Sequence, residues 1–214
     1  MSIKVNIGCG RTPTEGWLNF DNSPAIKLAK SPFKYKLAKA IGLLNEGQIE
    51  NIKWNMKHNI QFADATKSIP LQTSSVDCMY TSHMVEHLSQ KGARSFLKEV
   101  KRVLKVGGVV RIAVPDLRIA VDDYLETNDA DAFMRGILVQ APEINTLKQK
   151  INLFISGYRH HQWMYDGTSL SRLLIEMGFS SAEVCKDGKT NIIDADGLNL
   201  HEREKQSVYV EGIN

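Results

Sequence analysis

The chain has 214 residues, of which 43% are apolar and 24% are charged, so it can bury one sizeable core and is not expected to be disordered. Its net charge of +3 is too small to demand a nucleic-acid partner. Three scattered cysteines argue against a disulfide scaffold or zinc ribbon, and no apolar run approaches the roughly 20 residues that span a bilayer. We therefore expect a single domain over residues 1–214 in a reducing, cytoplasmic setting.

The first predicted strand covers residues 3–7 and leads directly into Gly8-Cys9-Gly10. Paired glycines at the carboxyl end of a strand remove two Cβ atoms, so the backbone can turn sharply and a nucleoside-type ligand can approach it. Thr12 can then cap a helix with Pro13 at its first position, but Gly16 stops that helix after about one turn. The sequence therefore predicts a ligand loop followed by a shortened first helix over Thr12–Glu15.

A second short strand, Trp17–Asp21, ends in an acidic residue and precedes a basic insertion over residues 24–58. Ser23-Pro24 and Ser31-Pro32 each combine a cap with a first-turn proline, which predicts short helices through Lys30 and through Leu44. The insertion carries seven lysines against two glutamates. Two interpretations stay open: a solvated helix face, or a surface that attracts an acidic carrier or touches a membrane.

Strands and helices alternate along the rest of the chain. The predicted strands are Ile60–Ala63, Val76–Thr81, Val109–Val114, Ala182–Lys186 and Ser207–Val210. The predicted helices are Lys91–Lys105, which Gly107-Gly108 ends, a helix that Asp116 caps and that extends to Glu126, and Thr168–Met177. Residues 128–160 lack a clean period and are expected to form a helical, lid-like insertion. This pattern is typical of an α/β, Rossmann-like domain with a mostly parallel sheet of about seven strands and helices on both faces.

Two aspartates follow the second and third predicted strands, at the edge where open α/β sheets bind ligands. The Asp21 carboxylate can accept bonds from both ribose hydroxyls of an adenosine group, and Asp64 would lie one strand further out, near the adenine amino group. For Asp64 the alternative is that it caps the turn before Thr66. A nicotinamide dinucleotide is disfavoured because Pro13 replaces the third glycine and Asp21 follows Gly10 by 11 residues rather than about 20.

These features together resemble the class I S-adenosylmethionine-dependent methyltransferases with a type 11-like domain. The resemblance rests on five segments that occur in the family's order over about residues 3–116: Val5–Gly10, Asp21, Phe62–Ala65, Ser82–Leu88 and Arg102–Gly108. It extends to a branch, often associated with glycans, that has a compact Gly-Trp-x-Asn-x-Asp start and a late His-x-Trp-x-Tyr-Asp. These motifs correspond to Gly16–Asp21 and His161–Asp166 in this sequence.

The resemblance implies an enzyme that uses S-adenosyl-L-methionine (SAM) and transfers its methyl group to a small-molecule, sugar or glycolipid acceptor, with oxygen as the expected target. Because the sulfonium is already an activated donor, the protein must mainly align the acceptor and exclude water. The residues expected around the cofactor are Gly8, Cys9, Gly10, Asp21, Asp64, Ala65 and Ser82. The identity of the acceptor and the oligomeric state stay open.

Two histidines are candidates for the acceptor side of the site. His83 would lie at the tip of the fourth strand, beside the methyl group, where it can act as a base; the alternative is a loop histidine bonded to the backbone. His161 begins the late motif, whose segment can fold over the cleft toward the acceptor. Alternatively, Trp163 and Tyr165 anchor that segment to the core. Asp116 is expected to cap a helix rather than to catalyse.

Two other functions compete with this prediction. Residues 83–87 spell H-x-x-E-H, which on a helix would offer two imidazoles to zinc, as in inverzincin proteases. We disfavour that function and expect no metal, because the segment follows a strand and no third ligand is evident; Glu86 and His87 would instead stabilise the start of the next helix. The other competitor is a cofactor-binding scaffold protein that has lost turnover.

Overall fold

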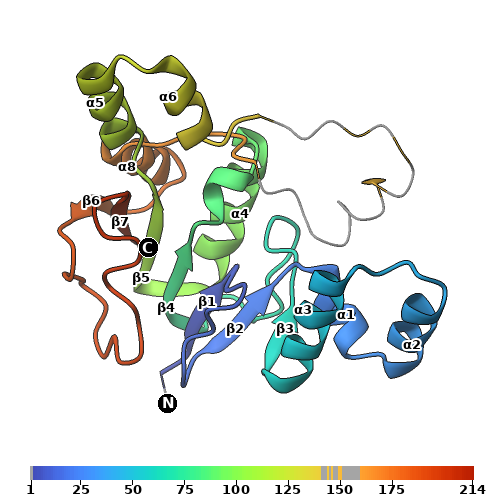
Figure 1. The fold of residues 1–214 in the computed structure, drawn as a ribbon. Helices are drawn as coiled ribbons and strands as arrows, with labels where there is room; N and C mark the ends of the chain where they lie inside the picture. Colours follow the sequence, from blue (N-terminus) through green and yellow to red (C-terminus); the bar gives the residue numbers. More distant parts are fainter. Residues whose placement is uncertain (1, 141–143, 145, 147–148, 151–159) are drawn as a thin grey trace.

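The computed structural model describes residues 2–140, 144, 146, 149–150 and 160–214 and contains a seven-stranded sheet (Figure 1). The strands are β1 Lys4–Ile7, β2 Leu18–Asp21, β3 Ile60–Phe62, β4 Val76–Ser82, β5 Leu104–Pro115, β6 Ser181–Cys185 and β7 Ser207–Ile213. They lie in the order β3-β2-β1-β4-β5-β7-β6; the first five are parallel to one another, and β7 is antiparallel to both β5 and β6. The predicted Rossmann-like, mostly parallel sheet is therefore confirmed.

The helices of the described residues gather at the two ends and over the middle of the sheet (Figure 1). They are α1 Pro24–Ala29, α2 Pro32–Ala40, α3 Glu46–Lys57, α4 Gln90–Val103, α5 Leu117–Thr127, α6 Ala130–Gly136 and α8 Gly167–Glu176, with a short 3-10 turn, η1, over Val85–His87. The basic helices α1, α2 and α3 lie together beside β3, whereas α5, α6 and α8 lie toward the β6 end. None of the helices in the described ranges is long and apolar enough to cross a membrane.

The core has two main parts, one on each side of the central strands. On one side α4 packs the apolar stripe that its sequence predicts, including Phe96 and Leu97, against β1, β4 and β5. On the other side Trp17 and Ile192 cover β4, β5 and β7, so a loop segment rather than a helix closes that part of the sheet. Residues 109–114 of β5 are buried throughout, as their apolar composition predicts for a strand covered on both faces.

The predicted helical turn over Thr12–Glu15 is wrong, because its polar groups bond elsewhere. The Thr12 hydroxyl donates to the Cys9 carbonyl over 2.9 Å instead of capping a helix. The buried Asn19 side chain accepts from the Thr14 amide over 2.8 Å and donates to the Thr14 carbonyl over 2.9 Å. A side chain of β2 therefore satisfies the backbone groups that a helical turn would have used.

Several boundaries also differ from their predictions. The second basic helix ends at Ala40 rather than Leu44, before Gly42 with φ +66°, and the separate α3 was not predicted despite its Asn45–Gln48 capping box. At the other end of the chain, α4 stops at Val103, and Gly107-Gly108 lies within the span of β5.

A C-terminal residue accounts for that earlier end of α4. The Asn214 side-chain amide donates to the carbonyls of Lys101, Leu104 and Lys105, and Leu104 has extended backbone angles. The end of the helix is thus set by the far end of the chain.

The insertion predicted over 128–160 is only partly described. Its first portion forms α6, which Asp129 caps by accepting from the Ala132 amide over 2.8 Å. Residues 141–143, 145, 147–148 and 151–159 lie outside the described residues, so the lid-like character predicted there stays a prediction. The predicted cap at Asp116 is confirmed, because its carboxylate accepts from the Arg118 amide over 2.9 Å at the start of α5.

Candidate active site

The glycine loop turns directly after β1 and is fixed to the end of β2. The amides of Gly8 and Cys9 both donate to the Phe20 carbonyl, over 2.8 and 3.2 Å. Gly8 has φ +71° and Gly10 has φ +51°, a region that costs other residues conformational energy. A Cβ on Gly8 would also lie 2.6 Å from Cγ of Met84, so this glycine is required both for its backbone angle and for space. The loop therefore lies directly against the segment that follows β4.

Asp21 connects this loop to the start of α1. One carboxylate oxygen accepts from the Gly10 amide over 3.0 Å, and the other accepts from the Ser23 amide over 2.7 Å. Burial is the main influence on this carboxyl and raises its pKa, while these two amide bonds oppose the rise. Asp21 thus lies at the end of β2, as predicted, and it orients the loop by hydrogen bonds.

Asp64 follows β3 and bonds to its own turn. Its Oδ1 accepts from the Thr66 amide and hydroxyl over 3.2 and 2.7 Å, and its Oδ2 lies 2.9 Å from Nζ of Lys67. The turn-capping alternative is therefore what the structure contains, and the predicted adenine contact stays a prediction. The Ala63 amide donates to the Asp21 carbonyl over 3.0 Å, which brings the two strand ends together.

Three further predicted cofactor contacts lie at the same edge of the sheet. Cys9 and Ala65 are both buried, and Ser82 is the last residue of β4, paired with Ala113 of β5. Burial raises the pKa of the Cys9 thiol to about 12, so this residue is not poised as a nucleophile. The carboxyl ends of β1, β2, β3 and β4 thus meet around the predicted cofactor residues.

His83 lies at the tip of β4, as predicted, with a positive φ of +48°. Its amide donates to the Ala113 carbonyl over 2.9 Å, while its ring contacts side chains. Nδ1 lies 3.3 Å from Oε1 of Glu86, and Nε2 lies 3.1 Å from the hydroxyl of Ser207. A ring held between a carboxylate and a hydroxyl can accept and pass on a proton. No local sequence signal predicts Ser207 as a partner of His83, because the two residues are 124 positions apart.

Glu86 points inward, contrary to the expected role at the next helix start. Ser89 is the residue that caps α4, by accepting from the Gly92 amide over 3.1 Å. The Glu86 side chain is 1% exposed, and neither carboxylate oxygen has a hydrogen-bond partner in the described structure. Besides the 3.3 Å contact with His83, its Oε1 lies 4.0 Å from Nε2 of His87. Only Val85–His87 form a 3-10 turn, so residues 83–87 do not make the single helix that the protease motif requires.

The late motif brings His161 to this cluster. The amides of Gln162 and Trp163 donate to the Glu86 carbonyl over 2.8 and 3.2 Å, and the His161 ring lies 5.1 Å from the His87 ring, between centroids. His161 is buried, and burial is the main cause that lowers its pKa. Its neutral imidazole therefore lies inside the site rather than at the surface.

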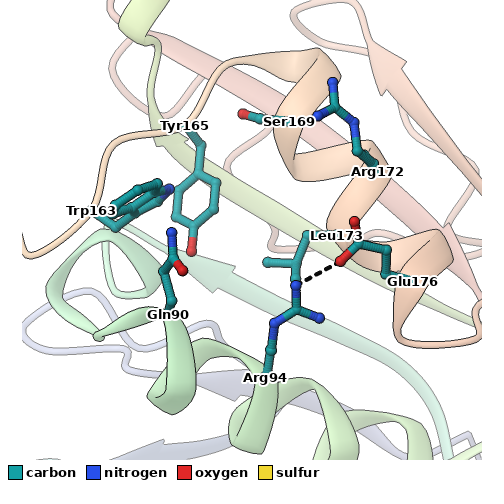
Figure 2. A pocket seen from close by; sticks show the side chains of 8 residues that line it. All are labelled: Gln90, Arg94, Trp163, Tyr165, Ser169, Arg172, Leu173 and Glu176. Atoms are coloured by element: carbon teal, nitrogen blue, oxygen red, sulfur yellow. Dashed lines mark hydrogen bonds and ion pairs between the residues drawn. The ribbon is translucent and has the colours of Figure 1, made fainter.

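The two aromatic residues of the late motif, Tyr165 and Trp163, differ in their burial. Tyr165 is buried and its carbonyl accepts from the Leu117 amide over 2.8 Å, so it anchors the segment as the alternative interpretation expects. Trp163 is 44% exposed and does not serve as a core anchor. Both line a pocket between α4 and α8 that also presents Arg94 and Arg172, a feature that the sequence did not predict (Figure 2). Figure 2 shows Arg94 paired with Glu176, over 2.6 Å, along its lower wall.

Comparison with known proteins identifies the family. A family model described as a methyltransferase domain matches residues 6–112, which is half of the chain and contains the glycine loop, both aspartates and residues 82–88. The chain belongs to the methyltransferase-domain family. No curated protein matches it. The predicted membership of the methyltransferases is thus confirmed, whereas the particular motif branch is not tested by this match.

Several solved methyltransferase structures have the same fold as this chain at low sequence identity. The DhpI–SAM–HEP complex is 12% identical with a TM-score of 0.51, covering 100% of this chain and 78% of DhpI. A SAM-dependent methyltransferase from Thermotoga maritima, described as a possible histamine N-methyltransferase, is 14% identical with a TM-score of 0.50 and coverages of 100% and 82%. PigF with SAH is 11% identical with a TM-score of 0.52, covering 99% of this chain and 50% of PigF.

Proposed function

We propose that this methyltransferase transfers a methyl group from SAM to an oxygen of a small-molecule, sugar or glycolipid acceptor. The observation that carries the proposal is the contact between the two parts of the site. Gly8 of the cofactor loop packs against Met84, and Met84 lies directly between His83 and the inward-facing segment that contains Glu86. A cofactor on the glycine loop would therefore present its methyl group toward a buried cluster of proton-accepting side chains.

The cofactor side fits an adenosyl group without phosphates. The two positive-φ glycines leave backbone exposed to the ligand, and Asp21 keeps unused lone pairs on a carboxylate that is already held in place by two amides. Ribose hydroxyls would donate to Asp21, and the adenine would lie toward Asp64 and the buried Ala65. SAM or SAH is bound in the DhpI and PigF structures, which have the same fold.

The acceptor side supplies the remaining requirements. The sulfonium already activates the methyl group, so the protein must hold the acceptor oxygen in line with it, exclude water and take up the hydroxyl proton. His83 lies between Glu86 and Ser207, where Nδ1 or Nε2 can receive that proton. His161 contributes a buried imidazole beside Glu86 and His87. We place the reaction in the cytoplasm, consistent with the three free cysteines Cys9, Cys78 and Cys185.

Calorimetry followed by a transfer assay tests this function. SAM and SAH should both bind the full chain, and a panel of hydroxylated sugars and lipids should reveal methyl transfer. His161→Ala should keep the affinity for SAH and lose transfer, whereas His201→Ala, at an exposed histidine, should change neither. If neither SAM nor SAH binds at high micromolar concentration, the proposal is wrong; binding without transfer to any acceptor would favour the scaffold alternative.

A further inference from the structure

We propose that Glu86, His87 and His161 bind a divalent transition-metal ion at the acceptor side of the site. One potential ligand atom from each of these three residues lies within 4.8 Å of the other two. Glu86 and His161 are buried, and His87 is partly buried. They come from two segments more than 70 residues apart, one with Glu86 and His87 and one with His161, and the hydrogen bonds from the amides of residues 162 and 163 to the Glu86 carbonyl hold those segments together.

The state of the Glu86 carboxylate is the strongest reason to place a cation here. Its side chain is 1% exposed, and neither of its oxygens accepts a hydrogen bond in the described structure. A buried carboxylate without hydrogen bonds costs several kcal/mol unless a positive charge compensates it. The groups around it are the imidazoles of His83, His87 and His161. A metal ion between them would supply the missing charge.

The tautomer of His87 also fits a metal ligand. Its Nδ1 lies 3.0 Å from the carbonyl oxygen of His160, which can only accept a hydrogen bond, so Nδ1 carries the proton. Nε2 then has a free lone pair, and it is this nitrogen that faces Glu86 over 4.0 Å. Metal-binding histidines commonly donate their other ring nitrogen to a backbone carbonyl in this way.

The donor set indicates the class of ion. Two imidazole nitrogens and one carboxylate suit zinc, manganese or a similar transition metal, whereas calcium and magnesium prefer sites built from oxygen. Three protein ligands leave positions open for substrate, as in catalytic sites. His83 lies at the edge of the cluster, 3.3 Å from Glu86, where it can act as a base or as a further ligand.

The role of the ion rests on the proposed methyl transfer. A cation bound beside the methyl group would hold the acceptor hydroxyl and lower its pKa. The hydroxyl proton passes to a base such as His83, the oxygen forms a bond to the methyl carbon, and the bond between that carbon and the sulfonium breaks with its electrons moving to sulfur. The products are the methyl ether, protonated base and S-adenosylhomocysteine.

A second group of metal-binding side chains provides a matched comparison. Asp187, His201 and Glu204 also lie within the same mutual distance, but all three are exposed. His201 already pairs with Asp187 over 2.5 Å, so this group has no unsatisfied buried charge. Surface groups of this kind are common without an ion, and His201 therefore serves as the control position.

Metal titration of the full chain tests the proposal directly. After removal of metals with a chelator, wild type should bind one equivalent of Zn²⁺ or, in a separate titration, one equivalent of Co²⁺. Calorimetry measures both titrations, and the visible absorption of Co²⁺ provides a second measurement. His161→Ala should weaken binding by at least about 100-fold, since changes outside the ligand shell already cost about 10–100-fold. His201→Ala should bind like wild type.

A second variant and a second ligand keep the outcomes separate. Glu86→Gln preserves the side-chain volume and removes the charge, so it should also lose metal while far-UV circular dichroism verifies its fold. Wild type that binds no ion, or variants at residues 86 and 161 that bind as wild type does, would overturn the metal site. SAH titrated into the same samples distinguishes the two proposals: SAH binding without metal binding contradicts only the metal site, and metal binding without SAH binding contradicts only the proposed function.

A separate feature supports an interaction surface on α2. Phe33, Leu37 and Ile41 repeat at intervals of four residues and are 77%, 52% and 65% exposed. The opposite side of the helix packs Ala38 into a small core with α1 and α3, so the exposed residues form a stripe that faces away from the domain. We infer that this stripe and its flanking lysines bind an anionic membrane surface.

The charges around the stripe favour that partner. Residues 24–45 contain five lysines and no acidic residue, and among them Lys34 and Lys36 are exposed on α2 itself. An exposed apolar stripe next to lysines is the arrangement by which helices lie in the headgroup region of anionic bilayers. α1 to α3 lie beside β3, on the cofactor half of the sheet (Figure 1). Such contact would suit an acceptor that is carried by lipid.

Co-sedimentation with vesicles tests the surface. The full chain should bind vesicles of phosphatidylglycerol with phosphatidylcholine, should bind phosphatidylcholine alone weakly, and should lose binding at high salt. Phe33→Ser with Leu37→Ser should weaken binding about tenfold or more, because each side chain loses its apolar burial. Ile193→Ser is the matched control, since Ile193 is 82% exposed but adjoins Asp194. Equal binding by the double variant, or binding only to soluble polyphosphate, would overturn the membrane surface.

Discussion

The proposed cofactor side, with Gly8, Gly10, Asp21 and Asp64, and the proposed acceptor side, with His83, Glu86, His87 and His161, are built in different ways. On the cofactor side, hydrogen bonds join residues that are close in sequence: Gly10 and Asp21 are 11 residues apart, and Asp64 and Thr66 are two apart. On the acceptor side, His83 contacts Ser207 across 124 residues, and His87 contacts His160 across 73. On the first side the carboxylates of Asp21 and Asp64 accept hydrogen bonds from nearby residues, whereas on the second the Glu86 carboxylate has no hydrogen bond in the described structure.

This difference relates structure to function. A cofactor site can be rigid and locally bonded because its ligand is constant. The acceptor side brings buried charge and imidazoles together from distant segments, at a cost in stability that a bound ion or substrate can offset. The following changes test how far the two sides depend on local and on distant interactions.

The largest expected effect comes from a buried ion pair between two residues that are 100 positions apart in the sequence. Arg111 of β5 and Glu211 of β7 are both fully buried, and Nη1 lies 2.8 Å from Oε1. Arg111→Met should reduce the free energy of unfolding by about 3–5 kcal/mol, because Glu211 would keep a buried charge without its partner. Urea denaturation measures the change.

An exposed arginine supplies the control for this change. Arg94 pairs with Glu176 at a half-exposed position, so Arg94→Met should cost less than about 1 kcal/mol. If the two variants lose similar unfolding free energy, burial does not make the Arg111–Glu211 pair more important than the exposed Arg94–Glu176 pair.

The next effect concerns the glycine loop. Gly8→Ala would place a Cβ 2.6 Å from Met84 at φ +71° and should lower SAH affinity about tenfold or more, since the backbone strain alone is worth about 1–2 kcal/mol. Gly10→Ala has φ +51° but meets no atom within 4 Å, so its effect should be smaller. Calorimetry with SAH compares them. Equal losses would mean that space beside Met84 does not matter.

Local signals explain what the sequence predicted well. The strands up to β5, the loop at Gly8 and the acid at Asp21 were all predicted, because glycine conformation, capping residues and strand patterns act over a few residues. The turn at Thr12 was predicted wrongly because the amide and carbonyl of Thr14 bond to the Asn19 side chain in the next strand. The end of α4 was missed for a similar reason, since Asn214 caps it.

The acceptor side was predicted only in part. His83 and His161 were recognised individually, but no pattern indicated that His161 would lie beside Glu86 and His87. The spacing of the H-x-x-E-H letters suggested a zinc pair on one helix, and the structure instead combines two of those residues with a histidine from the late motif. Such contacts arise from the packing of the whole sheet, which sequence periodicity does not encode.

A pH experiment separates the two aspartates of the cofactor side. Burial raises the pKa of Asp21, so its carboxylate takes up a proton at a higher pH than a free aspartate does. For Asp64, desolvation is the largest single influence, but the hydrogen bonds from Thr66 and Lys67 and the charge of Lys67 together outweigh it and lower the pKa. SAH affinity should therefore fall as the pH decreases through the raised pKa of Asp21.

Calorimetry over that acidic range, with the two asparagine variants, tests which carboxyl is responsible. Asp21→Asn should weaken SAH binding by about 1–3 kcal/mol at neutral pH and remove this pH dependence. Asp64→Asn should retain the pH dependence of wild type. If the pH dependence disappears in Asp64→Asn instead, the assignment of ribose recognition to Asp21 is wrong.

The smallest effect concerns a helix cap next to the acceptor side. Asp166 ends the late motif and caps α8 by accepting from the Ser169 amide over 2.7 Å, and this bond is the main cause that lowers its pKa. Asp166→Ala should cost about 1 kcal/mol of unfolding free energy at neutral pH, and Asp166→Ser, which can still cap, should cost less. Because the folded-state pKa is depressed, this stability is present above the unfolded value and is lost as the pH falls through the folded one. Urea denaturation of wild type and Asp166→Ala should therefore converge in strong acid; a difference that persists there would mean that Asp166 stabilises the acceptor side through packing rather than through its charged cap.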